Sequence, residues 1–159
     1  MMVRVEPLVP VRRREPFDHP QWLFDVKYDG FRALCHVERG RGHFMSRNGN
    51  GFRRFDALST QVATELGVDE AVLDGELIAA DETGRPRFWD LLRGTRVPAY
   101  VAFDLLWLGG IDLRPLPLSE RRTALRELLA KASPVLSEAV AWRCSRTGSA
   151  DRLDAPLQG

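Results

Sequence analysis

Two runs near the start of the chain have the hydrophobic pattern of strands. Residues 22–26 (WLFDV) alternate apolar and polar positions, and residues 31–37 (FRALCHV) are again rich in apolar types. A period of two is typical of a half-buried strand. Asp29-Gly30 lies between the runs, and this dipeptide is a strong signal for a tight hairpin turn. The pattern therefore predicts a β-hairpin formed by residues 22–26 and 31–37.

Helical spacing follows in the next segment. Phe55, Leu58, Val62 and Leu66 recur every three or four residues, which predicts an amphipathic helix over 56–66 with Asp56 as its cap. Residues 87–93 read as a short helix ended by a glycine.

Apolar runs at 71–80 and 99–108 predict two more strands, of which the second is the most apolar and should be central. Ser119 is expected to cap a last helix. In that helix Leu125, Leu128 and Leu129 would face inward, and Arg121, Arg122 and Glu127 outward. The expected fold is α+β, with antiparallel sheets and flanking helices.

Composition is that of a globular protein with one sizeable domain. The chain has 159 residues, of which 44% are hydrophobic and 28% charged. It shows no apolar run of membrane-spanning length and no signal-peptide pattern, so we expect a cytoplasmic protein without a membrane partner. Two cysteines and three histidines lack the spacing of a disulfide framework or a zinc site.

The net charge is +1, but the arginines are grouped. Such groups are either local phosphate-binding patches or solvated surface. They are Arg12, Arg13 and Arg14, Arg39 and Arg41, Arg53 and Arg54, and Arg121 and Arg122.

Lys27-Tyr28-Asp29-Gly30-Phe31-Arg32, in the pattern K-x-D-G-x-R, is the candidate for chemistry. A lysine amine becomes a nucleophile only after it loses its proton, which desolvation and a nearby cation such as Arg32 favour. Asp29 opposes this loss unless it faces a metal or the substrate. The alternative is an exposed hairpin whose charged residues are merely solvated.

Three further motifs follow in order: Ser46-Arg47-Asn48-Gly49, LDGEL at 73–77 and FDLL at 103–106. Together with the lysine motif they resemble the nucleotidyltransferase motifs of ATP-dependent DNA ligases. The sequences that flank the motifs look most like the ligase domains of bacterial end-joining ligases, and the similarity covers residues 7–130. The resemblance implies an ATP-grasp-like adenylation domain that uses ATP and Mg²⁺ or Mn²⁺.

The resemblance also implies a role for each motif residue. Lys27 would be the nucleophile that attacks the α-phosphate of ATP. The remaining roles are ribose binding by Arg32 and Glu76, adenine stacking by Phe103, phosphate contact by Arg47, and support of later steps by Asp29.

Structural considerations bear on two of these residues, Phe103 and Glu76, and on Asp74 of the same motif. Phe103 lies in an apolar strand, where a phenylalanine is by default a core residue. A carboxylate such as Glu76 is costly in an apolar strand unless it has a partner, which favours function. Asp74 is either part of the motif or a turn former with Gly75.

The chain departs from the family pattern after these motifs. A complete enzyme of this kind continues with an E-G-[IV]-x-x-K segment, a second basic motif and an OB-fold domain, and none of them is found here. We therefore divide the chain into a lead-in at 1–20, a partial adenylation domain at 21–144 and a disordered tail at 145–159.

The implied substrate is nicked or broken double-stranded DNA, with end-joining proteins or further domains as partners. Such a protein would be cytoplasmic and associated with the bacterial nucleoid when on DNA. Two alternatives stay open: an RNA ligase or capping-type nucleotidyltransferase, and a non-catalytic truncated remnant.

Overall fold

The computed structural model describes residues 5–7, 11–15, 17, 19, 21–144 and 150–152. The chain forms two compact units. One consists of Met1–Pro7 and Tyr28–Glu138, and the other of Leu8–Lys27 and Ala139–Gly159.

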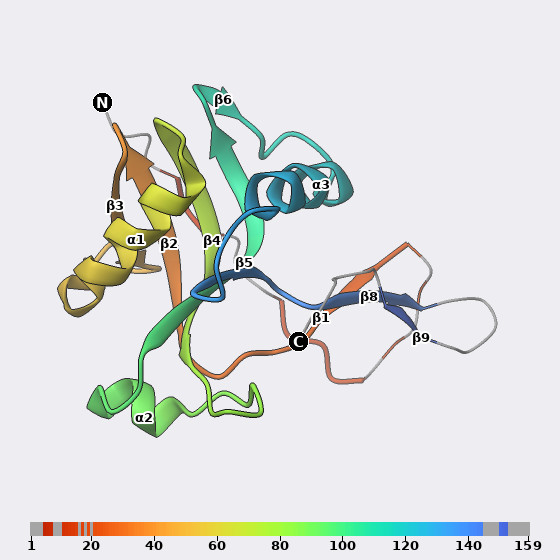
Figure 1. Ribbon diagram of the computed structural model, residues 1–159. Coiled ribbons are helices and arrows are strands. Elements are labelled where there is room, and N and C mark those ends of the chain that lie inside the picture. Colours follow the sequence, from red (N-terminus) through yellow and green to blue (C-terminus); the bar gives the residue numbers. More distant parts are fainter. Residues whose placement is uncertain are drawn as a thin grey trace. The chain divides into compact units, whose positions relative to one another are not determined.

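The first unit is built on a six-stranded sheet whose spatial order is β3-β2-β4-β5-β6, with β7 pairing parallel to β5 (Figure 1). The other pairings in this sheet are antiparallel. Its strands are β2 (Phe31–Glu38), β3 (Arg41–Ser46), β4 (Glu70–Ala79), β5 (Pro98–Leu108), β6 (Ile111–Asp112) and β7 (Leu136–Glu138).

Two of the helices cover one side of this sheet. They are α1 (Asp56–Leu66) and α3 (Leu118–Leu129), whose apolar residues join those of the central strands in one core (Figure 1). The short helix α2 (Phe88–Arg93) contacts β4, and a 3-10 turn, η1 (Arg53–Phe55), leads into α1. Among the described helices, none is long and apolar enough to cross a bilayer.

The predicted helices and strands of this unit are largely confirmed. The helix expected over 56–66 is α1, and the strands expected over 71–80 and 99–108 are β4 and β5. β5 lies inside the sheet, between β4 on one side and β6 and β7 on the other. The short helix ends where expected, because Gly94 adopts the left-handed conformation at its C-terminus.

Both predicted helix caps are wrong by one or two positions. Asp56 is the first residue of α1, and Phe55 holds the cap position because η1 runs directly into the helix. Pro117 precedes α3 in place of Ser119. A proline suits a helix start because its missing N–H would have no intrahelical partner there.

The hairpin predicted around Asp29-Gly30 is wrong. β1 (Leu23–Asp25) pairs with β8 (Ala141–Cys144) in a separate three-stranded sheet, whereas β2 pairs with β3 and β4. Gly30 does not have a positive φ. A Cβ there would overlap the Leu77 carbonyl of β4, so close approach of a neighbouring strand requires this glycine, and a tight turn does not.

The second unit contains this three-stranded sheet, β1-β8-β9. Strand β9 (Ala150–Arg152) pairs antiparallel with β8. The rest of the tail predicted at 145–159 lies outside the described residues.

A histidine pair lies across β2 and β3, with His36 buried and His43 half-buried. The rings of His36 and His43 stack with centroids 5.1 Å apart. The buried Nδ1 atom of His36 makes no hydrogen bond to any described residue. Burial, and then the neighbouring His43, lower the pKa of His36 to about 4. Burial also lowers the pKa of His43, against the opposing effect of Glu38 and Asp56.

We expect the free energy of unfolding to fall as the pH drops from about 6.5 towards 4. In this range His36 is protonated in the unfolded chain but stays neutral in the folded chain, where its pKa is lower. At pH 5 the loss from His36 is on the order of 2 kcal/mol. Urea unfolding at pH 8, 6.5 and 5 measures it, and His36→Leu should flatten the dependence whereas the exposed His19→Leu should not. An equally steep dependence in His36→Leu would assign the effect to other groups.

Candidate functional site

The site is built on the face of the sheet opposite to α1. Side chains alternate between the two faces of a strand. Ala33 and Leu73 belong to the core beneath α1, so their neighbours Arg32 and Asp74 face the other way. Glu76 shares the face of Asp74 and lies directly opposite Arg32 across the β2–β4 ladder.

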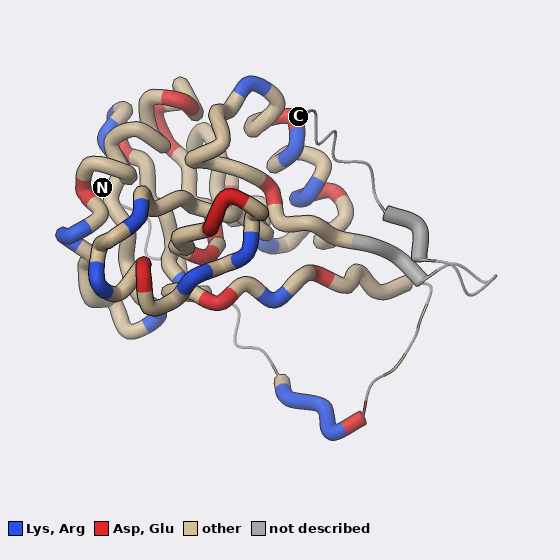
Figure 2. Tube along the Cα trace, turned by 60° about the horizontal axis from the view of Figure 1, so that its bottom comes forward, with Lys and Arg blue, Asp and Glu red and all other residues tan. Residues whose placement is uncertain are grey.

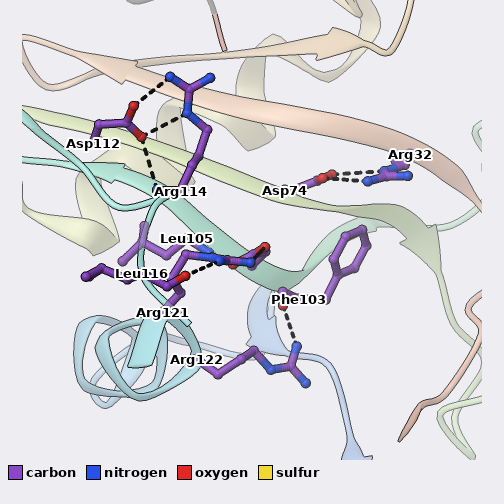
Figure 3. Close-up of polar contacts among 10 residues, drawn as sticks. Arg32, Asp74, Phe103, Leu105, Asp112, Arg114, Leu116, Arg121 and Arg122 are labelled. Atoms are coloured by element: carbon purple, nitrogen blue, oxygen red, sulfur yellow. Dashed lines mark hydrogen bonds and ion pairs between the residues drawn. The ribbon is translucent and has the colours of Figure 1, made fainter. Parts of the chain in front are cut away.

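Asp74 holds Arg32 in a two-point ion pair (Figure 3). The Nε and Nη2 atoms of Arg32 donate to the two carboxylate oxygens at 3.0 and 2.6 Å. The side chain of Asp74 is 1% exposed and that of Arg32 26%. Burial raises the pKa of Asp74 although Arg32 opposes this, and the bond to Asp74 raises the pKa of Arg32. Asp74 is thus a buried strand residue, and the reading of it as a turn former is wrong.

A glycine is required at position 75 because neighbouring groups leave no room for a side chain. A Cβ there would lie 2.6 Å from the ring of Tyr100 and 2.5 Å from the Val101 carbonyl oxygen. The ring therefore passes directly over Gly75, and the Tyr100 hydroxyl reaches the carbonyl oxygens of Ala33 and Leu73 at 2.9 and 3.1 Å. Gly75 thus lets β2, β4 and β5 pack closely beside Asp74 and Glu76.

Phe103 lies at an irregularity of β5. Ala102 pairs with Gly75 and Asp104 with Asp74, so Phe103 is an extra residue without a partner on β4. Such a bulge redirects the side chain. The half-buried ring of Phe103 lies with its centroid 5.4 Å from the guanidinium carbon of Arg32, and Phe103 belongs to neither of the described apolar clusters. Its reading as a core residue is therefore wrong.

Arg121 and Arg122 of α3 are buried and point towards β5, so their predicted outward orientation is wrong. Arg121 Nε and Nη2 donate to the two oxygens of Asp104, each at 2.8 Å. Arg122 Nη1 donates to the Phe103 carbonyl at 2.6 Å (Figure 3). The two arginines turn inward because β5 offers them acceptors, the Asp104 carboxylate and the Phe103 carbonyl. Charge-assisted hydrogen bonds to these groups stabilise the arginines more than water does.

These groups form a row of charges across the sheet, in which Arg32 at one end and Arg121 at the other flank the two carboxylates of Asp74 and Asp104. Asp74 and Asp104 are cross-strand partners, and the charge of Asp104 contributes to raising the pKa of Asp74. Like charges directly opposite each other are unfavourable. Each carboxylate is therefore compensated by an arginine of its own.

One sequence signal points to this support. Asp104 lies in the most apolar strand, and a carboxylate there needs a partner as much as Glu76 does. Asp104 was therefore recognisable from the sequence as a residue that needs a partner, although it was not among the predicted site residues. Nothing in the helical pattern marks Arg121 and Arg122 as buried.

The other predicted site residues are not joined to this group by any described contact. Lys27 is exposed and follows β1 in the second unit, so its place beside Arg32 stays a prediction. Asp29 is exposed ahead of β2, and Arg47 is exposed in the turn after β3. That turn is closed by Ser46, whose N–H donates to the Asn50 carbonyl at 2.8 Å.

The arginine groups serve local structure at several positions. Arg54 donates to the carbonyls of Leu91 and Leu92 at 2.5 and 3.1 Å, which adds donors to carbonyls at the end of α2. Along the described trace, basic and acidic residues are interspersed (Figure 2). With Arg121 and Arg122 buried, that pair is neither of the expected alternatives, a phosphate-binding patch or solvated surface.

Comparison with known proteins gives matches over most of the chain. The LigD multifunctional non-homologous end joining protein of Pseudomonas aeruginosa is 39% identical over 116 residues, which cover 69% of this chain and 14% of that protein. A DNA ligase of Natronomonas pharaonis is 35% identical over 150 residues, or 85% of this chain and 27% of that protein. The chain thus spans well under half the length of these relatives.

Solved structures agree with the sequence matches. The ligase domain of Mycobacterium tuberculosis LigD superposes with a TM-score of 0.68 at 28% identity, covering 84% of this chain and 48% of that one. A mycobacterial DNA ligase D complexed with ATP and MES gives 0.66 at 27% identity, with the same coverage. The ATP dependent DNA ligase domain profile matches residues 13–153, and the chain therefore belongs to the family of ATP-dependent DNA ligase domains.

Proposed function

We propose that this chain binds ATP and carries the lysine that becomes adenylated in an ATP-dependent DNA ligase. The observation that carries the proposal is the grouping of Arg32, Glu76 and Phe103 on one face of the sheet. Arg32 lies opposite Glu76 and beside the ring of Phe103. A cation, a carboxylate and an aromatic ring in this arrangement suit a nucleoside.

The ribose would be held by Arg32 and Glu76. Asp74 accepts only two hydrogen bonds from the guanidinium, so further donors of Arg32 are available to sugar oxygens. A carboxylate such as Glu76 accepts hydrogen bonds from sugar hydroxyls. Because Asp74 fixes the guanidinium plane, this binding would cost little rotamer entropy.

The adenine would stack on Phe103. Base–aromatic stacking needs a flat ring with one accessible face, and Phe103 is half-buried and turned out of the β4–β5 ladder by the bulge. A structurally similar ligase D was solved with ATP, which supports ATP as the nucleotide.

The proposed reaction is nucleotidyl transfer to Lys27. The neutral Nζ atom attacks the α-phosphorus, the N–P bond forms as the bond to the β-phosphate oxygen breaks, pyrophosphate leaves, and the amine releases a proton. Arg47 is proposed to contact a phosphate, and Asp29 to support the later steps. In such transfers the rate enhancement comes mainly from the orientation of the reactants and from preorganised charges that stabilise the transition state.

Magnesium or manganese is proposed as the metal that accompanies ATP. Among the described residues, no group of three or more His, Cys, Asp or Glu side chains is arranged to hold a metal. Mg²⁺ is commonly bound through substrate phosphates and one or two carboxylates, so its ligands would come largely from ATP.

The substrate we propose is nicked or broken double-stranded DNA, within a cytoplasmic repair system that includes end-joining proteins. The end joining named for the LigD relatives supports this assignment. The family match favours DNA ligation over the RNA ligase and capping alternatives. The division into a lead-in, an adenylation domain and a tail is likewise proposed.

Incubation of the chain with magnesium and either ATP or GTP, followed by intact-mass spectrometry, tests the proposal. We expect a gain of one adenylate with ATP and no gain with GTP, because the matched family is that of ATP-dependent DNA ligases. Transfer from GTP would favour a capping-type enzyme. A chain that binds ATP without forming an adduct would be a nucleotide-binding remnant.

A further inference from the structure

The bulge that presents Phe103 needs a hydrogen-bond donor from outside the sheet. An extra residue in one strand leaves ladder groups unpaired, and a buried unpaired carbonyl is costly. The Phe103 carbonyl accepts a hydrogen bond from Arg122 Nη1 at 2.6 Å. Beside it, the Leu105 N–H donates to Asp104 Oδ1 at 2.9 Å.

Arg122 is itself fixed in place. Its side chain is 4% exposed, and its Nε atom lies 3.4 Å from Glu138 Oε1 on β7. Glu138 pairs with Ala102, the residue just before the bulge. Arg122 thus joins two neighbouring strands at the residue that carries the ring.

We propose that Arg122 is a positioning residue that sets the direction of the Phe103 ring and thereby the strength of base stacking, without touching the nucleotide. This inference rests on the proposed binding of adenine by Phe103. A guanidinium that holds the Phe103 carbonyl fixes the peptide plane from which the side chain leaves. Loss of that donor lets the bulge relax to another geometry and turns the ring away from Arg32.

Arg126 offers a matched control on the same helix. It lies one turn after Arg122 and also reaches Glu138, with Nε 3.2 Å from Oε2, but its side chain is 48% exposed. Its described hydrogen bonds go to Glu138, and none goes to the β5 backbone. Arg122→Met and Arg126→Met therefore both remove a contact to Glu138, and only the first removes the donor to the bulge.

The experiment compares the affinities of the full chain for ATP and for ribose 5-triphosphate, which lacks the base. The dissociation constant for ribose 5-triphosphate divided by that for ATP measures the contribution of base stacking. We expect this ratio to fall roughly tenfold in Arg122→Met and by a similar factor in Phe103→Leu. In the double variant the ratio should fall no further than in either single variant. Arg126→Met should keep the ratio. An unchanged ratio in folded Arg122→Met, or additive losses in the double variant, would overturn the proposal.

A second readout needs no nucleotide. The guanidinium carbon of Arg32 lies 5.4 Å from the centroid of the Phe103 ring, so the NMR chemical shift of the adjoining Nε–H responds to the position of the ring. We expect this shift to change in Arg122→Met and to stay the same in Arg126→Met. If wild type does not prefer ATP to ribose 5-triphosphate, the proposed function fails while this shift still tests positioning. If Arg122→Met does not fold, Arg122→Lys replaces it in both experiments, with the same expected and contradicting results. Lysine keeps the charge but cannot reach both the Phe103 carbonyl and Glu138.

Discussion

Replacing Lys27 by alanine is expected to abolish covalent labelling of the chain by ATP. The amine is the proposed attacking group. The other nitrogen side chain of the K-x-D-G-x-R motif, Arg32, stays protonated and is therefore not a nucleophile. The measurement is radiolabel transfer from α-labelled ATP, with peptide mapping of the product. ATP binding should persist, because the groups proposed to hold the nucleoside are unchanged.

The chain provides an ideal control for this experiment, since it has two lysines, Lys27 and Lys131. Lys131 lies just beyond α3 and is exposed, so Lys131→Ala should label like wild type. Label that survives in Lys27→Ala, or that maps to Lys131, would refute the assignment of the nucleophile.

The second large effect is expected on stability, from breaking the buried pair of Asp104 and Arg121. Their side chains are 4% and 9% exposed. Asp104→Leu leaves the Arg121 charge buried without its carboxylate, which costs about 3 kcal/mol of unfolding free energy. The estimate is at the low end because removal of Asp104 also relieves its repulsion of Asp74. Urea unfolding followed by circular dichroism measures the change.

Asp112→Leu is the matched control. Asp112 holds Arg114 in the same two-point geometry, at 2.8 and 2.7 Å, but the two side chains are 34% and 42% exposed. Its loss should change stability little. Adding Arg121→Met to Asp104→Leu should recover much of the lost stability, because no charge then remains buried. A single variant as stable as wild type would show that Arg121 finds water or another partner.

Predictions that depended on local pattern agree closely with the structure. The helix over 56–66 was recognisable because its apolar residues share one face, and α1 has these bounds. β4 and β5 were recognisable as long apolar runs. The order of motifs was enough to indicate the family, which the comparisons confirm.

Predictions that depended on partners far along the chain were wrong where local signals were ambiguous. Asp29-Gly30 has the composition of a tight turn, but a neighbouring strand takes the space that a Cβ would need at Gly30. Arg121 and Arg122 have the composition of a solvated helix face. Their burial depends on Asp104 and on the Phe103 carbonyl, which lie seventeen to nineteen residues earlier in the chain.

The sequence by itself determined the family and the main helices and strands of the first unit, and it supplied the candidate site residues, because periodicity and motif order are written in consecutive residues. Tertiary structure decided how Arg32, Glu76 and Phe103 come together and what supports them. The bulge at Phe103 exists only in the pairing of β5 with β4, and the charge row from Arg32 to Arg121 crosses three strands and a helix. Such features arise from register and burial, which depend on contacts between distant segments and leave no local pattern to read.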